Sequence, residues 1–228
     1  MIIKNRVELA TTELRKNAID IIEVGIERVL PSNLMRRALH YDITSRVLNI
    51  YQSTFNLAKG RIFVIGGGKA SGMMAKELER IIPTEHITAG IINCKGSDYK
   101  TDKIKVKSAG HPIPDQRGID GVKEMLSLKE NYTIGRDDTI ICLISGGSSA
   151  LMPSPAAGLS LADKQKITAI LLASGANIGE VNTVRKHLSR TKGGQLGSHF
   201  APSSIIALII SDVIGNDLSS HCIWTYLS

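Results

Sequence analysis

Four short apolar runs, rich in β-branched residues, most constrain what this chain can fold into. Stretches with helical spacing of apolar residues alternate with these runs. Strands that are buried on both sides and alternate with helices are typical of a parallel sheet whose two faces are covered. Residues 103–107 (KIKVK) alternate and predict one further strand with a solvent-facing side. The sequence therefore predicts an α/β domain of three layers with a mostly parallel sheet. The apolar runs are 61–65, 88–94, 138–144 and 204–210, and the helical stretches are 71–82, 116–130, 161–174 and 180–190.

The residues before the first of these strands have a different pattern. Apolar side chains recur at helical spacing over 5–30 and predict one long amphipathic helix, which Pro31 and Ser32 separate from a second helix. Residues 41–60 have a polar character and predict a connection. A chain of 228 residues is long enough for one large α/β domain or two small ones.

The net charge of +7 is concentrated where it can serve a small anion. Four cations and no carboxylate lie between 181 and 200, and the aromatic content of 4% leaves no aromatic side chains interleaved with them. Platforms that stack single-stranded nucleic acid need such aromatics, so we expect no nucleic-acid partner. A local phosphate or carboxylate site is the preferred interpretation, and a solvated helix face is the alternative.

The cysteines and the hydropathy pattern indicate the kind of cellular compartment in which the chain is expected. Cys94, Cys142 and Cys222 are an odd number at wide spacing, which supports neither a zinc site nor a disulfide framework. This fits a reducing, cytoplasmic location. The longest apolar run, 205–210, is too short to span a bilayer, so no membrane partner is expected.

The first glycine-rich loop, 66–72 (GGGKASG), follows a predicted strand and begins a helix. Gly67 and Gly68 let a ligand approach the main chain, and Lys69 adds a positive charge at a helix N-terminus. The spacing of a nucleotide P-loop is absent, and Lys69 replaces the second glycine of a GxGxxG frame. An anion cradle is predicted here, against the alternative of a plain turn with a surface lysine.

The second loop comes directly after the 138–144 strand. Its hydroxyls and backbone amides could cradle a carboxylate or a phosphate. A nucleophilic serine is a rival interpretation, but the GxSxG elbow is absent. An ordinary turn with a serine cap is the plainer alternative. The candidate residues are Ser145, Gly146, Gly147, Ser148 and Ser149.

A third group of candidates lies on the 180–190 helix and the turn after it. Asn182 and Arg185 share one helix face, and Lys192 with Gly193 forms a cationic turn. This arrangement suits a triphosphate or its transition state. His187 is interpreted as a surface or packing histidine.

Two further motifs carry weaker signals. Asp212 follows the last strand and could bind Mg²⁺ or orient a hydroxyl, with Asp217 as a second metal candidate and a turn cap as the alternative. In 110–115 (GHPIPD), Asp115 is a predicted N-cap. His111 could contact a ligand or could be an ordinary loop histidine.

Taken together, five motifs resemble the glycerate 2-kinases, the glycerate kinase family whose C-terminal domain is named MOFRL. The motifs occur in the family's order and are VIGGGKASGMMA (64–75), GHPIPD (110–115), LISGGSSALMPSP (143–155), NTVRKHLSRTKGGQLG (182–197) and IISDVIGNDLSS (209–220).

The resemblance implies a Rossmann-like N-terminal domain and phosphorylation of D-glycerate to 2-phosphoglycerate with ATP and Mg²⁺. It implies that Lys69 contacts the substrate and that the 145–149 loop, Arg185 and Lys192 border the same cleft. Lys69, Arg185 and Asp212 are accordingly the candidates for catalysis. The 145–149 loop is the candidate for substrate binding, and Gly67, Gly68, Asn182, Lys192 and Gly193 are the candidates for ATP binding.

The resemblance covers 1–220 as one domain and stops at a tail, 221–228, that is unlike the family. A frameshift or truncated reading frame is the hypothesis, with the second, MOFRL-type domain absent and activity in doubt. Sequencing the encoding DNA past Ser220 tests it. A nicotinamide-dependent hydroxypyruvate reductase and a basic binding module are the alternative functions. The oligomeric state stays open, with a homo-oligomer among the options.

Overall fold

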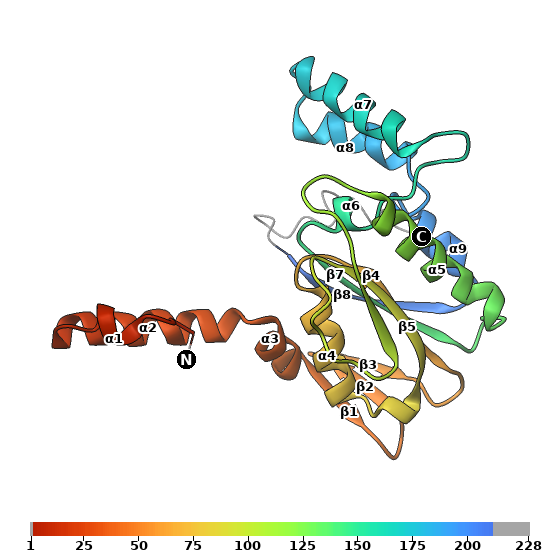
Figure 1. Ribbon diagram of the computed structural model, residues 1–228. Helices are drawn as coiled ribbons and strands as arrows, with labels where there is room; N and C mark the ends of the chain where they lie inside the picture. Colours follow the sequence, from red (N-terminus) through yellow and green to blue (C-terminus); the bar gives the residue numbers. More distant parts are fainter. Residues whose placement is uncertain (1, 212–228) are drawn as a thin grey trace.

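A five-stranded parallel sheet forms the centre of the chain in the computed structural model, which describes residues 2–211 (Figure 1). The strand order is β6-β5-β4-β7-β8, and every neighbouring pair is parallel. The predicted parallel α/β sheet is therefore confirmed. The strands are β4 (Ile62–Gly67), β5 (Ile87–Cys94), β6 (Ile104–Ser108), β7 (Thr139–Ser145) and β8 (Ser204–Ile210).

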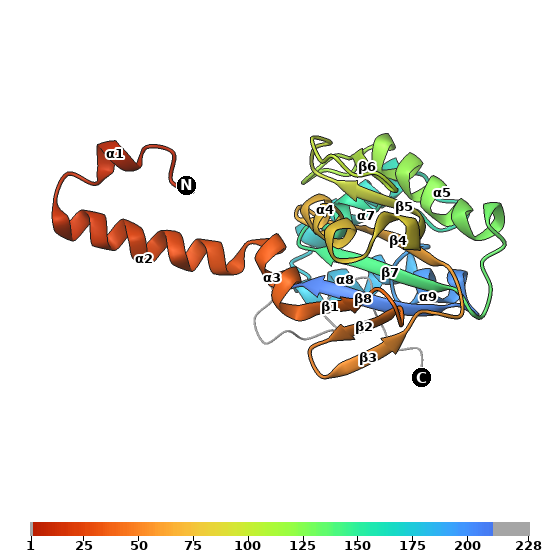
Figure 2. The ribbon, with the colours of Figure 1, turned by 90° about the horizontal axis from the view of Figure 1, so that it is seen from below.

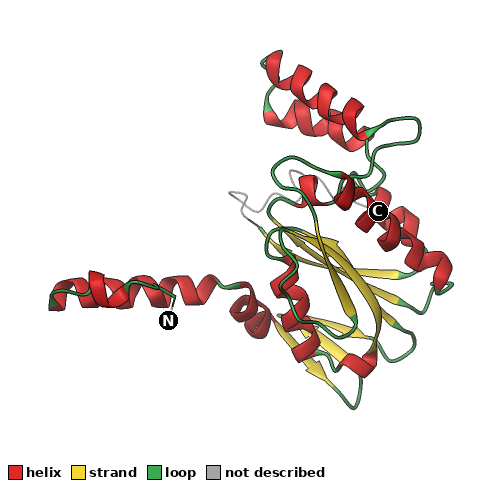
Figure 3. Ribbon diagram, in the orientation of Figure 1, coloured by secondary structure: helices red, strands yellow, loops and turns green. Residues whose placement is uncertain are grey.

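Helices cover both faces of this sheet, which makes the three predicted layers (Figure 3). Successive strand residues point to opposite faces, so Phe63 belongs to one core cluster and Val64 to the other. Val64 packs in the cluster of α4 (Ser71–Ile81), which follows β4 after a short loop. Phe63 packs in the cluster of α5 (Gln116–Asn131) and α9 (Gln195–Phe200). A short 3₁₀ helix, Thr84–His86, precedes β5.

The strand order creates a switch point at the middle of the sheet. The chain runs outward from β4 to β5 and β6, and then returns to the other side of β4 to form β7 and β8. The connections that follow β4 and β7 therefore leave in opposite directions. Ligands of open α/β sheets bind at such a point, beyond the carboxyl ends of the two strands.

The prediction of a polar connection over 41–60 is wrong. A three-stranded antiparallel sheet stands there, with β1 (Leu39–Asp42), β2 (Val47–Ile50) and β3 (Ser53–Asn56). Leu39, Tyr41 and Leu48 are buried in the same core cluster as Val64. Each strand has only four residues, too few for their alternation to show against polar neighbours.

The N-terminal helix is divided and largely detached from the core. The structure has α1 (Arg6–Leu9) and α2 (Glu13–Val29) in place of one helix over 5–30, whereas the predicted second helix is confirmed as α3 (Pro31–Ala38). The Thr12 hydroxyl caps α2 by accepting a hydrogen bond from the amide of Arg15. Figures 1 and 2 show α2 projecting away from the sheet. Its apolar residues Leu14 and Ile21 are 82% and 74% exposed.

A second projecting unit is the antiparallel pair of α7 (Leu161–Ala173) and α8 (Ile178–His187) (Figure 1). Both helices begin with a capping box, Ser160 with Asp163 and Asn177 with Glu180. The predicted helices are confirmed, although α8 begins and ends slightly earlier than expected. A four-residue helix, α6 (Ser148–Leu151), precedes the pair. None of the helices in the described residues is long and apolar enough to cross a membrane.

At the amino end of the sheet, the buried carboxylate of Asp138 pairs with the more exposed guanidinium of Arg61. Asp138 accepts hydrogen bonds from the backbone amide of Arg61 (2.9 Å), from its guanidinium (2.7 Å to Nη2) and from the amide of Gly135 (2.9 Å). Burial raises the pKa of Asp138, but these hydrogen bonds outweigh it and lower the pKa below the ordinary value.

We predict that Asp138→Asn lowers the free energy of unfolding at pH 7 by about 1–3 kcal/mol, because the donors of Arg61 and Gly135 lose a buried, charged acceptor. A lowered native pKa means that the stabilisation is complete above the unfolded pKa and is lost as the pH falls through the native pKa. The difference in unfolding free energy between Asp138→Asn and the unsubstituted protein should therefore shrink below about pH 4. Urea unfolding at several pH values measures it. The exposed neighbour Asp137→Asn is the control, and an equal loss in both variants contradicts the prediction.

Candidate functional site

The loops after β4 and β7 interlock at the switch point. The amide of Lys69 donates to the carbonyl of Gly146 (2.9 Å), and the amide of Ala70 donates to Ser145 Oγ (2.9 Å). Ser71 Oγ lies 3.3 Å from Ser145 Oγ and donates to the carbonyl of Leu143 (3.1 Å). The structure therefore brings together the two glycine-rich motifs that the sequence analysis singled out separately.

Two glycines make this approach sterically feasible. Gly68 has φ +152°, and a Cβ there would lie 2.2 Å from Ser145 Oγ. Gly147 has φ +84°, and a Cβ there would lie 2.8 Å from ring atoms of His111 and 3.3 Å from Cγ of Lys69. Only glycine adopts both the conformation and the contact without strain. Lys69, His111 and Gly147 consequently meet at one place.

The residues of the 145–149 loop have different environments. Ser145 is 4% exposed and its hydroxyl holds the neighbouring loop. Ser148 and Ser149 are half-buried in the first turn of α6, where backbone amides have no acceptor within the helix. These amides, rather than the Ser145 hydroxyl, are the groups best placed to receive an anion.

Arg185 reaches this loop from the helix pair. Its Nη2 donates to Ser149 Oγ, and its Nε is buried without a hydrogen-bond partner among the described residues. A buried guanidinium nitrogen without an acceptor is costly, so the position suits an incoming anion. Asn182, one turn earlier on α8, is half-buried.

The remaining candidates lie deeper or outside the described residues. Lys192, from the predicted cationic turn, is fully buried. Gly193 follows it with φ +60°. Gly67 and Gly68 are buried, and a Cβ on Gly67 would meet the side chain of Met152 at 2.5 Å. Asp212 and Asp217 fall outside residues 2–211, and within that range no group of three or more His, Cys, Asp or Glu residues could hold a metal.

Asn93, at the end of β5, was missed by the sequence analysis. It is fully buried, and its Nδ2 donates to the carbonyls of Gly118 and Leu151, each at 2.8 Å. The backbone carbonyl of Asn93 accepts a hydrogen bond from the amide of Gly68 (3.1 Å). Asn93 thus ties the lysine loop to α5 and α6. The available signal was a single amide side chain inside the apolar run 88–94.

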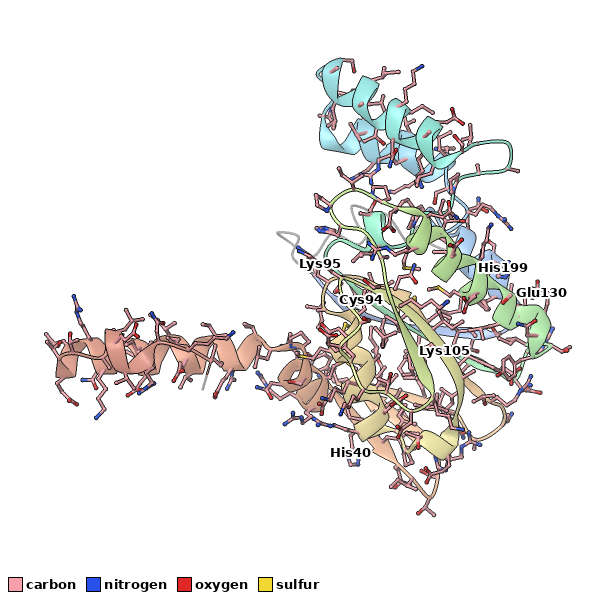
Figure 4. The ribbon with its side chains drawn as sticks, in the orientation of Figure 1. His40, Cys94, Lys95, Lys105, Glu130 and His199 are labelled. Atoms are coloured by element: carbon pink, nitrogen blue, oxygen red, sulfur yellow. The ribbon has the colours of Figure 1, made fainter. Side chains whose placement is uncertain are left out.

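A pocket of about 550 Å³ opens beside His111. Burial, followed by the positive charges of Lys69 and Lys95, lowers the pKa of His111, so its imidazole is neutral at pH 7. Asp115 caps α5 as predicted and accepts from the amides of Gly118 (3.1 Å) and Gly110 (3.0 Å). The pocket is lined by residues that follow β5 and β6, namely Lys95, Gly96 and the segment from Ser108 to Asp115, with Arg117. Figure 4 labels Lys95, directly after Cys94 at the end of β5.

The cysteines offer no reactive group in the described part of the chain. Cys94 and Cys142 are buried free thiols, and burial raises the pKa of Cys142 to about 12. A thiolate nucleophile is therefore absent among residues 2–211.

The chain resembles known proteins over most of its length. The model of a family described as "Domain of unknown function (DUF4147)" matches residues 17–221. Glycerate 2-kinase of Pyrococcus horikoshii is 41% identical over 207 residues, which are 89% of this chain and 46% of that protein. A protein of Agrobacterium vitis with a provisional hydroxypyruvate reductase name is 41% identical over 160 residues, 70% of this chain and 41% of that protein.

A solved structure extends the likeness to three dimensions. Glycerate kinase of Thermotoga maritima superposes with a TM-score of 0.77 at 34% identity, over 92% of this chain and 48% of that one. The chain spans somewhat under half the length of the curated relatives it matches. The matching domain model and these relatives show that the chain belongs to the glycerate 2-kinase family, whose N-terminal, DUF4147 domain it represents.

Proposed function

We propose that this chain provides the N-terminal half of an enzyme that phosphorylates D-glycerate to 2-phosphoglycerate with ATP. The observation that carries the proposal is the meeting of two glycine-rich loops and two cations, Lys69 and Arg185, at the switch point of the sheet. The names of the relatives from Pyrococcus and Thermotoga support the same reaction.

The geometry suits phosphoryl transfer because that reaction depends on positioning and charge neutralisation more than on covalent chemistry. Lys69 and the amides at the start of α6 would hold the substrate carboxylate or a phosphate. Arg185, oriented by Ser149, would face the transferring phosphoryl group and bind its developing charge. Asn182, Lys192 and Gly193 are retained as proposed ATP-binding residues, and Asp212 as a proposed catalytic residue.

Mg²⁺ enters this proposal together with ATP. The described residues bring hydroxyls and amides to the site but no cluster of carboxylates, so they do not form a metal cage of their own. Mg²⁺ is commonly held by one or two carboxylates and the phosphates of the nucleotide, which leaves Asp212 and Asp217 as its proposed protein ligands. When bound, it would neutralise phosphate charge.

The reductase alternative lacks a supporting feature in the structure. A dinucleotide needs a glycine where its pyrophosphate approaches the first loop, and Lys69 occupies that position with its side chain beside Gly147. We also propose that the enzyme works in the cytoplasm, where ATP is available and thiols stay reduced. The greater length of the relatives further supports a second, MOFRL-type domain as a requirement for full turnover.

We predict that Lys69→Ala lowers kcat/KM about 10²–10³-fold, because one fixed positive charge is lost from the anion site. A coupled ADP-release assay with D-glycerate measures it, on this chain and on a version joined to the C-terminal half of a relative. The matched control is Lys76→Ala, an exposed lysine on α4. Turnover of Lys69→Ala near that of the unsubstituted protein would refute the role.

We predict that Arg185→Lys lowers kcat about 10–100-fold, because an ammonium cannot contact Ser149 and a phosphoryl oxygen through separate nitrogens. The same assay measures the effect, with thermal melts to show that the fold is kept. Arg190→Lys, an exposed arginine that follows α8, serves as the control. Equal activity in the two variants would remove Arg185 from the mechanism.

A further inference from the structure

We propose that the pocket beside His111 binds the nucleoside part of the phosphoryl donor, while the two interlocked loops hold its phosphates. This assignment rests on the proposed kinase function and adds the position and orientation of the nucleotide. It follows from the location, the size, the lining and the rigidity of the pocket.

The pocket lies next to the proposed anion site, along the carboxyl ends of the strands. Its lining follows β5 and β6, while Lys69 follows β4, and these strands are neighbours in the order β6-β5-β4. Adjacent strands are about 4.8 Å apart, so the pocket begins roughly 5–10 Å from the Lys69 loop. His111 belongs to both places, because it lines the pocket and its ring contacts Gly147. An elongated ligand can therefore occupy both at once.

The size of the pocket indicates which of the two proposed substrates, glycerate or the nucleotide, fits it better. Sites for ligands of drug or cofactor size have volumes of about 300–1,000 Å³. At about 550 Å³ the pocket lies within this range, and a three-carbon acid would fill only a small part of it. The nucleotide is therefore the better occupant.

The lining combines an apolar segment with basic and acidic side chains. Pro112, Ile113 and Pro114 form the apolar wall, and Ile113 is 69% exposed. A planar base can cover such a wall and remove its apolar surface from water. Lys95 and Arg117 line the same pocket, and Arg117 is paired with Asp115, which lines it as well. His111 is also in the lining, where its neutral imidazole can stack on a base or accept a hydrogen bond.

The apolar wall is held in place before any ligand arrives. Asp115 accepts from the amides of Gly110 and Gly118, which closes the loop at both ends. Gln165 on α7 donates to the carbonyl of Pro114 (3.1 Å), which fixes the loop from the helix pair. The proline rings restrict it further. A preformed wall reduces the ordering cost of binding.

The test is binding of ADP and of inorganic tripolyphosphate to this chain by isothermal titration calorimetry, without glycerate. Ile113→Asn, which removes the apolar side chain without adding a charge, should weaken ADP binding about tenfold, equal to about 1.4 kcal/mol, and leave tripolyphosphate binding unchanged. The matched control is Ile43→Asn, at an isoleucine of the β1–β2 turn that is 59% exposed, and it should not alter either affinity. Lys69→Ala should weaken both ligands.

Three results would overturn the assignment. They are unchanged ADP affinity in Ile113→Asn, an equal loss for ADP and tripolyphosphate in that variant, and no ADP binding by the unsubstituted chain. Thermal melts show whether each variant is folded. The kinase proposal fails separately, through the absence of glycerate-dependent ADP release, because the binding measurement contains no glycerate.

Discussion

The contact between the ends of β4 and β7 is the constraint on which the rest of the site depends. Backbone and hydroxyl groups of the two loops satisfy one another through Lys69 to Gly146 and Ala70 to Ser145. Side chains larger than hydrogen at Gly68 or Gly147 would separate the loops. The charge of Lys69 can therefore be presented beside the start of α6 only because glycine occupies these positions. The hydrogen bonds that the buried Ser145 hydroxyl makes with Ala70 and Ser71 also make this arrangement rigid.

The two ends of the sheet serve different purposes. At the amino end, the buried carboxylate of Asp138 is bonded by Arg61 and Gly135, which stabilises the strands. At the carboxyl end, Gly147 has a left-handed backbone conformation and the buried Nε of Arg185 has no hydrogen-bond partner among the described residues. Both features cost stability. Stability gained at one end can offset the cost of an anion site at the other.

Much of the sheet and the two main loops could be predicted from the sequence. Buried strands such as 138–144 and glycine-rich strand ends leave local signals in composition. Contacts between distant segments leave none, so the role of Asn93 in joining three elements and the pocket beside His111 needed coordinates. The burial of Lys192 was missed for a related reason, since a lysine after a helix is usually solvated.

The helix pair α7 and α8 has a mechanical consequence. One helix contacts the proline loop through Gln165, and the other contacts the serine loop through Arg185. Any rotation of the pair about its base would displace both contacts together and would therefore move the two proposed ligand sites at the same time. Energetic coupling of this kind is reciprocal: whatever one ligand does to the affinity of the second, the second does to the first.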